Sequence, residues 1–185
     1  CTALTLVRRV ADGVRRLKPA PPGARPGPAA PLVQKNGPPR VLLVKLAEMG
    51  STVLALPALA RLQELHPGVR LHYLCFKENR SVIDLIPEIP WEAVHTIRTD
   101  SAATVIRDSL RVLRTLRRLK LDAAIDLEIF SRASAALIYA SGARIRVGYH
   151  RFFAEGLNCG DLFTHRVSHN SHLHISGAFM ALVEA

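Results

Sequence analysis

A turn of polar and small residues follows the first strongly apolar run of the chain. Lys45, Glu48, Gly50 and Ser51 come after Val41–Val44, whose length and β-branched content are typical of a buried central strand. Glycine lets a ligand approach the backbone closely, and the N-terminus of a following helix favours anions. In open α/β sheets, ligands bind outside the carboxyl ends of strands, beside such a turn. We therefore expect a ligand site here, with Lys45 and Glu48 as its charged side chains.

Known nucleotide-binding signatures are missing from this turn. It has no GxGxxG fingerprint, and it is not a Walker A loop because no lysine precedes Ser51 and Thr52. The alternative to a ligand site is a solvated Glu48 and a Lys45 whose ammonium group reaches solvent from the strand end.

A second polar group ends the apolar segment at residues 122–127. Asp126 and Glu128 alternate to the same side of the extended chain and point toward the same sheet edge as the first turn. Arg132 begins the next expected helix and could bind a phosphate or carboxylate through two parallel hydrogen bonds. The alternatives are that Asp126 caps the following loop, Glu128 is solvated and Arg132 is an ordinary surface arginine.

Four histidines cluster before and at the start of the last expected helix: His165, His169, His172 and His174. Their H-x3-H and H-x2-H spacings suit a metal site on a helix, but no cysteine or carboxylate is placed to complete the ligand set. We therefore expect no metal, and expect these histidines to line a cleft or to make ordinary contacts between helices.

The three cysteines, Cys1, Cys75 and Cys159, are widely separated and form no CxxC pair. This spacing indicates a reducing compartment and no disulfide framework. No apolar run approaches the length needed to cross a bilayer.

Strand-like runs alternate with helical periodicities, which favours a parallel sheet built from right-handed βαβ crossovers. The expected strands are residues 41–44, 69–76, 93–97, 122–127 and 145–149. The expected helices are one capped by Ser51 or Thr52 and continuing to 65, then 81–86, 101–119, 131–140 and about 171–185.

The helix expected at residues 101–119 has two distinct sets of side chains. The apolar positions expected to face the core are Ile106, Leu110, Leu113 and Leu116. The arginines that share one face are Arg107, Arg111, Arg114 and Arg118. We interpret the arginine face as solvated, with contact to anionic lipid head groups as the alternative.

Composition separates two segments from the expected folded domain. Residues 1–17 form a basic amphipathic leader, which either docks on the body, extends freely or lies on an anionic membrane. Residues 18–39 contain eight of the twelve prolines and predict a linker. The chain does not begin with methionine.

The net charge of +10 suggests an anionic partner, which is a phosphorylated substrate, an acidic lipid surface or nucleic acid. Nucleic acid fits less well, because aromatic residues make up only 5% of the chain and no stacking platform or recognition helix is evident.

Two stretches resemble glycosyltransferase family 9, the ADP-heptose:lipopolysaccharide heptosyltransferases. The family's amino-terminal signature is matched by VLLVKLAEMGSTVLALPALARLQELHPGVRLHYL. A later strand, helix and strand of the family are matched by LDAAIDLEIFSRASAALIYASGARIRVGYHR. Together the matches cover roughly residues 40–151.

The resemblance implies an α/β fold with a Rossmann-like, mainly parallel sheet, the amino-terminal half of a GT-B type glycosyltransferase. The full-length enzyme would transfer heptose or a similar sugar, with inversion, from an ADP-sugar to a lipopolysaccharide-type acceptor, without a further cofactor. Residues 40–170 would bind the lipid-linked, phosphorylated acceptor, and residues 171–185 would lead to a missing carboxyl-terminal domain that binds most of the nucleotide sugar. The isolated chain would be inactive, and the enzyme would be cytoplasmic, peripheral at the inner face of the inner membrane.

The family usually has an aspartate after the glycine, assigned as the general base that takes the acceptor's hydroxyl proton. This chain has Ser51 there, and a serine hydroxyl does not accept a proton near neutral pH. Three explanations are open: Glu48 supplies the carboxylate, another residue is the base, or transfer activity has been lost. We favour Glu48, with Ser51 in a capping role.

The residues expected to bind the acceptor are Lys45, Gly50, Ser51, Asp126, Glu128 and Arg132, with Asp126 or Glu128 able to share the base role. The competing function is a catalytically degenerate family member that acts as a binding module for an anionic surface or partner. A third, a stand-alone nucleotide-binding domain, would show affinity for ATP or ADP.

Overall fold

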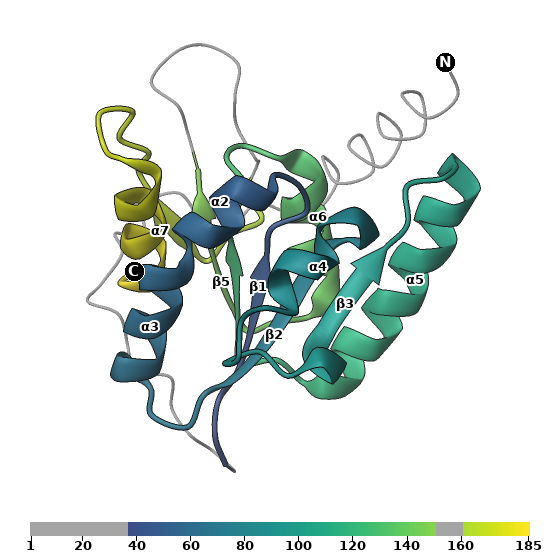
Figure 1. Cartoon of the computed structure of the whole chain (residues 1–185), viewed down its shortest axis with the longest axis horizontal. Helices are drawn as coiled ribbons and strands as arrows, with labels where there is room; N and C mark the ends of the chain where they lie inside the picture. The colour runs from purple at the N-terminus through teal and green to yellow at the C-terminus, as the bar shows by residue number, and fades with distance from the viewer. Residues whose placement is uncertain (1–36, 151–160) are drawn as a thin grey trace.

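Six strands, all parallel to their neighbours, form a sheet at the centre of the described part of the chain (Figure 1). The computed structural model describes residues 37–150 and 161–185. The spatial order of the strands is β3-β2-β1-β4-β5-β6. Their bounds are β1 Arg40–Val44, β2 Arg70–Phe76, β3 Val94–Ile97, β4 Ala123–Asp126, β5 Ile145–Tyr149 and β6 His165–Val167. The Rossmann-like α/β arrangement expected from the sequence is confirmed, and β1 lies inside the sheet.

Helices cover both faces of the sheet (Figure 1). One face is covered by α2 Met49–Leu54, α3 Leu56–Leu65, α4 Arg80–Ile83 and α7 Ile175–Val183, and the other by α5 Ala102–Leu119 and α6 Arg132–Ser141. Short 3-10 turns lie at Lys77–Asn79 and Trp91–Ala93. Successive residues of β1 alternate between the two cores, because Leu43 packs with the first layer and Leu42 with the second.

The helix expected after the first turn is divided into α2 and α3. The break falls at Ala55, and Pro57 occupies the first turn of α3. Proline has no backbone N–H and cannot continue the hydrogen-bond ladder of α2, but it is compatible with the start of a new helix. The expectation that Ser51 or Thr52 caps the helix is wrong, because α2 begins at Met49 and Glu48 occupies the N-cap position.

The expected core face of α5 is also wrong in part. Ile106 is 40% exposed and Leu110 48%, whereas Asp108 is only 1% exposed. The guanidinium of Arg98, just after β3, donates to both carboxylate oxygens of Asp108, from Nε at 2.8 Å and Nη2 at 3.2 Å. This ion pair turns Asp108 toward the sheet, together with the buried side chains of Val112 and Leu116. The four arginines predicted to share a face are all exposed.

Three further elements, β6, α7 and α4, differ from the prediction in their presence or in their bounds. β6 was not expected, because its three residues form no apolar run and pair only along β5 at the edge of the sheet. α7 is shorter than the expected 171–185, and α4 begins one residue earlier than expected and ends three residues earlier. α5 has a serine cap that was not predicted, because Ser101 at its N-cap accepts a hydrogen bond from the N–H of Thr104.

Several expectations concern residues outside the described ones: the leader at 1–17, the linker apart from its last three residues, and Cys1 and Cys159. Cys75 is buried with a free thiol. No helix in the described ranges 37–150 and 161–185 has both the length and the apolar character required to span a membrane.

Candidate active site

The two polar groups singled out in the sequence meet at the carboxyl edge of the sheet. β1 and β4 are neighbours, with Val44 beside Asp126, so the residues that follow each strand leave the sheet side by side. Nζ of Lys45 lies 3.1 Å from Oε2 of Glu48 and 3.3 Å from Oε2 of Glu128. One lysine thus joins the turn after β1 to the loop after β4.

Glu48 is the exposed carboxylate of this group. Its side chain is 73% exposed, and its backbone has φ 69°, a left-handed conformation that costs a non-glycine residue about 1–2 kcal/mol. Its Oε2 accepts a hydrogen bond of 2.8 Å from the hydroxyl of Ser51. The Ser51 hydroxyl, followed by the Lys45 ammonium group, holds the pKa of Glu48 below its usual value. Glu48 is therefore an ionised carboxylate at the open side of the turn.

Lys45 is buried, with only 3% of its surface exposed. The alternative in which its ammonium group reaches solvent is therefore wrong. Two carboxylates neutralise the charge and accept hydrogen bonds from Nζ, which compensates for the loss of water around it.

Glu128 holds the backbone of the first turn in place. Its Oε1 accepts hydrogen bonds from the N–H groups of Leu46 at 2.7 Å and Ala47 at 3.1 Å, while its other oxygen contacts Lys45. Its side chain is 15% exposed, so the alternative of a solvated Glu128 is wrong. The observed contacts give Glu128 a positioning role in the free protein.

Asn79 completes the restraint on this turn, and sequence reasoning missed it. Its buried side chain donates from Nδ2 to the carbonyl of Leu46 at 2.8 Å, and the N–H of Phe76 donates to the same oxygen at 2.9 Å. Both polar groups of the Leu46 backbone therefore have fixed partners, Glu128 on one side and β2 with its following turn on the other. No local signal could have found Asn79, because its partner lies 33 residues away.

Asp126 lies beneath the loop and is 1% exposed. Its Oδ1 accepts from the N–H of Glu128 at 3.1 Å, which is the loop-capping contact that we considered as an alternative. Loss of hydration raises the pKa of Asp126 to about 8. The hydroxyl of Ser134 lies 2.7 Å from Oδ2 of Asp126 and 2.9 Å from the carbonyl of Ser131. A serine has one hydroxyl hydrogen, so a protonated Asp126 that donates to Ser134 lets Ser134 donate to Ser131.

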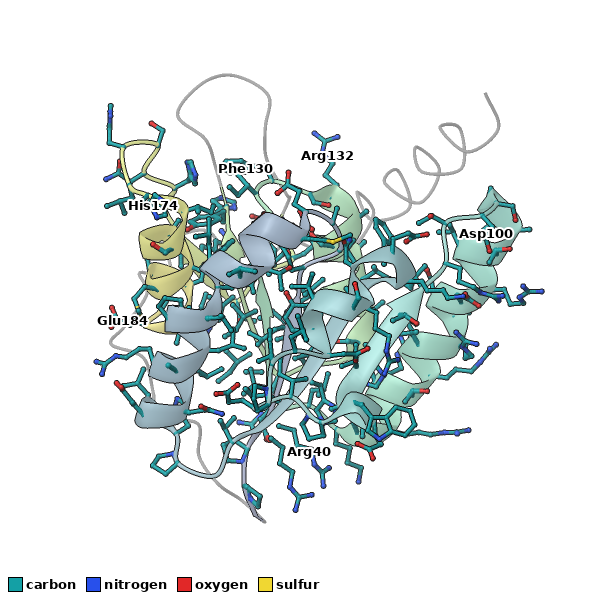
Figure 2. All side chains as sticks on the ribbon, viewed as in Figure 1. Arg40, Asp100, Phe130, Arg132, His174 and Glu184 are labelled. Atoms are coloured by element: carbon teal, nitrogen blue, oxygen red, sulfur yellow. The ribbon has the colours of Figure 1, made fainter. Side chains whose placement is uncertain are left out.

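The remaining predicted residues lie at the rim of the same edge. Arg132 is the first residue of α6 and is exposed, as Figure 2 shows beside Phe130. Gly50 lies inside α2, where a Cβ atom would meet nothing within 4 Å, so no close packing in the free protein requires a glycine there. Ser51 lies in the first turn of α2, next to Glu48.

An aromatic cluster beside the site was also missed from the sequence. Phe130 has a left-handed φ of 56°, rare for a bulky residue, and its ring lies 6.2 Å from the ring of Tyr149 and 5.4 Å from that of His169. The hydroxyl of Tyr149 donates to the carbonyl of Ala178 at 2.7 Å. The cluster ties the β4–α6 loop to β5 and to the segment before α7.

Two of the four predicted histidines have ordinary polar partners. Nδ1 of His165 lies 3.0 Å from the Thr164 hydroxyl, and Nδ1 of His174 lies 2.7 Å from the Ser176 hydroxyl. Within the described ranges, no group of three or more histidine, cysteine, aspartate or glutamate side chains could hold a metal ion. A separate apolar groove of about 480 Å³ lies between α3 and residues 82–88.

Comparison with known proteins identifies the fold. No protein-family model and no curated protein matches the chain. The structure of E. coli heptosyltransferase WaaC with ADP matches with a TM-score of 0.66 and 20% identity, over 78% of this chain and 46% of that one. A glycosyl transferase family 9 structure from Veillonella parvula DSM 2008 matches with a TM-score of 0.66 and 18% identity, over 79% and 40%. E. coli ADP-heptose lps heptosyltransferase II matches with a TM-score of 0.62 and 17% identity, over 78% and 40%.

The chain therefore spans less than half the length of the solved structures that it matches. At this level of identity the likeness concerns the fold alone, and it confirms the Rossmann-like α/β domain that the sequence resemblance implied.

Proposed function

We propose that this chain is the acceptor-binding half of an inverting glycosyltransferase that transfers heptose or a similar sugar from an ADP-sugar to a lipopolysaccharide-type acceptor. The observation that carries the proposal is the exposed Glu48 carboxylate, held by Ser51 and Lys45 at the carboxyl end of a central strand. In α/β sheets this edge is where ligands bind. The structures that the chain resembles include heptosyltransferases, one of them with bound ADP.

In the proposed reaction, Glu48 takes the proton from an acceptor hydroxyl as the oxygen attacks the anomeric carbon. The new carbon–oxygen bond forms while the bond from that carbon to the ADP oxygen breaks, and ADP leaves with the electron pair. Lys45 and Ser51 fix the carboxylate within reach of the hydroxyl. Because the two hydrogen bonds leave Glu48 a weak base in the open site, closure that excludes water would raise its pKa toward the value that proton transfer needs.

The acceptor contacts are proposed to divide into two kinds. Gly50, Ser51 and the exposed Arg132 are placed to touch the acceptor, with Arg132 facing a phosphate or carboxylate. Lys45, Asp126 and Glu128 act through the shape of the turn, because their polar atoms bond to one another or to the protein. The ADP-sugar is the donor substrate, bound mainly by residues beyond this chain, and we propose no cofactor. We further propose a cytoplasmic enzyme, peripheral at the inner membrane, where a lipid-linked acceptor is found.

The proposal is tested in the full-length protein by following ADP release from ADP-heptose with an inner-core saccharide acceptor. We expect Glu48→Gln to lower kcat by about 10²–10⁴-fold while acceptor affinity, measured by calorimetry, stays within about twofold. Glu64→Gln, a change at an exposed glutamate of α3, should leave both unchanged. Retained turnover in Glu48→Gln, or sugar transfer by the isolated 185-residue chain, would contradict the proposal.

One observation favours the second candidate, a binding module without transferase activity. The lowered pKa of Glu48 is what an anchored ion pair shows and is the opposite of the raised value typical of a carboxylate base near neutral pH. Absence of transfer by the full-length protein with every nucleotide sugar tested, together with acceptor binding that Glu48→Gln preserves, would assign this second function.

A further inference from the structure

α5 has an apolar side that does not face the domain. Its buried side chains, among them Val112 and Leu116, pack against the sheet. Ile106 and Leu110, one turn apart on another side of the helix, are 40% and 48% exposed. Neighbouring large aliphatic side chains in solvent often mark a surface that a partner covers, whereas single exposed residues scattered over a surface do not.

Positive charge lies along this apolar side. Four exposed arginines follow each other at spacings of three or four residues: Arg107, Arg111, Arg114 and Arg118. The only acidic residue of α5, Asp108, is turned inward, where its carboxylate pairs with Arg98 at 2.8 Å and with Arg111 at 3.5 Å. The solvent side of α5 therefore combines a short aliphatic stripe with a row of cations, and no exposed carboxylate of the helix opposes them.

The position of the stripe relates it to the candidate active site. β3 is parallel to β1, so the start of α5 lies toward the same carboxyl edge as Glu48, and Asp100 marks this start in Figure 2. Ile106 is the fifth residue of α5, about 6 Å along the helix axis from its beginning. A flat partner that covers Ile106 and Leu110 would therefore lie toward the sheet edge that carries Glu48.

We propose that this side of α5 docks on an anionic lipid bilayer, with Ile106 and Leu110 entering the head-group region, Arg107, Arg114 and Arg118 pairing with lipid phosphates, and Arg111 adding charge beside its contact with Asp108. Charge complementarity favours a polyanionic surface, and the aliphatic pair favours lipid over nucleic acid, because phosphates and sugars offer no apolar layer for aliphatic side chains. The inference rests on the proposed function, because an enzyme with a lipid-linked acceptor works at a bilayer. Its test needs neither donor nor acceptor, so docking and sugar transfer can fail independently.

The test is co-sedimentation of the full 185-residue chain with phosphatidylcholine vesicles, with and without about one third phosphatidylglycerol. We expect binding only to the anionic vesicles. The quadruple variant with Arg107, Arg111, Arg114 and Arg118 changed to Gln should bind them at least tenfold more weakly. Ile106→Ser with Leu110→Ser should weaken binding by about tenfold.

Two variants serve as matched controls. Changing Arg8, Arg9, Arg15 and Arg16 to Gln removes the same charge from the leader. Leu65→Ser with Leu85→Ser removes exposed leucines from the other layer, where these side chains are 41% and 80% exposed. Both should bind as the unchanged chain does, and circular dichroism checks that every variant is folded. Loss of binding in a control but not in the α5 variants overturns the proposal. The proposal is also overturned if the quadruple arginine variant loses vesicle binding while the Ile106→Ser, Leu110→Ser variant binds fully. That result would mark a site for polyanions in general, with no contribution from the aliphatic side chains.

Discussion

The hydroxyl of Ser51 donates a 2.8 Å hydrogen bond to Oε2 of Glu48. Ser51 stands where the family that the chain resembles usually has an aspartate. Instead of supplying a carboxylate itself, Ser51 orients the carboxylate of Glu48, three residues earlier in the chain. The left-handed backbone of Glu48 brings its side chain back over the first turn of α2, where Ser51 and Lys45 both reach it.

Ser51→Ala should change the pH dependence of transfer. The Ser51 hydrogen bond is the largest cause of the lowered pKa of Glu48, so its removal raises that pKa. The carboxylate is then protonated at a higher pH, and the acid limb of kcat/KM should move toward neutral pH. The measurement is the pH–rate profile of the full-length protein, with Ser81→Ala, an exposed serine, as control. An acid limb that does not move would remove Glu48 from the rate-determining proton transfer.

Glu128→Ala should destabilise the fold strongly for a loop substitution. The change leaves the N–H groups of Leu46 and Ala47 without their acceptor and removes one partner of the buried Lys45. We expect a loss of about 3 kcal/mol in the free energy of unfolding in urea. Glu128→Gln should cost less, because its amide oxygen still accepts from the backbone.

The comparison for Glu128 is Glu64→Ala, which removes a carboxylate from an exposed ion pair with Arg61 and should change stability by less than about 1 kcal/mol. Equal effects of the two alanine substitutions would show that the turn does not depend on Glu128.

Asp126→Asn should remove a pH dependence of stability. In the folded chain the pKa of Asp126 is raised to about 8, whereas the unfolded chain has the ordinary value of about 3.9. Between these values the folded state holds a proton that the unfolded state has released, so this contribution to stability is present at low pH and is lost as pH rises through 8. As pH rises across this range, the free energy of unfolding of Asp126→Asn should therefore increase relative to that of the unchanged chain by about 1 kcal/mol per pH unit. Urea unfolding at several pH values measures the difference, and a difference independent of pH would contradict the burial of a protonated carboxyl.

Glu48→Gly should abolish the proposed activity without a net gain in stability. Glycine adopts φ near 69° without the steric cost of about 1 kcal/mol that glutamate carries, but the change also removes one of the two carboxylates that neutralise the buried Lys45, so we expect the free energy of unfolding not to rise. Lys120→Gly is the matched comparison, because Lys120 has φ 51° at the end of α5 and takes no part in the site. If only Lys120→Gly stabilises, the hydrogen bonds of Glu48 outweigh its backbone strain.

Gly148→Ala should be destabilising, whereas Gly177→Ala should not. A Cβ at Gly148 would collide with the ring of Phe163, which is 2% exposed and has little room to move. We expect a loss of about 1–3 kcal/mol from overpacking. Gly177 lies inside α7 with nothing within 4 Å of the same position, so Gly177→Ala should be neutral or stabilising by up to about 1 kcal/mol. Thermal unfolding of the two variants compares them directly.

The elements that could be predicted from sequence are those whose apolar pattern is set by burial alone. The central strand at Val41–Val44 and the alternation of strands and helices follow from this rule. The rule fails in α5, because an ion pair with Arg98 carries Asp108 inward while Ile106 and Leu110 remain outside. Such a pair depends on the neighbouring strand, which local periodicity does not contain.

The candidate site was predictable in its location but not in its internal contacts. Parallel strands end at one edge, so the groups containing Glu48 and Glu128 were expected to meet. That Glu128 bonds to the backbone of Leu46, and that Asn79 bonds to the same residue from the other side, depends on partners 82 and 33 residues away. Residue type indicates that a carboxylate or an amide needs partners, and only the fold decides which ones they are.

The bonds from Glu128 to Leu46 and Ala47 also bear on the order in which the molecule is made. Because these contacts bridge about 80 residues, the N–H groups of Leu46 and Ala47 have no Glu128 acceptor while the ribosome is still adding the segment between them. The turn that carries Glu48 precedes the fourth strand in the chain, so it gains its bonds to Glu128 only after that strand has been placed beside the first.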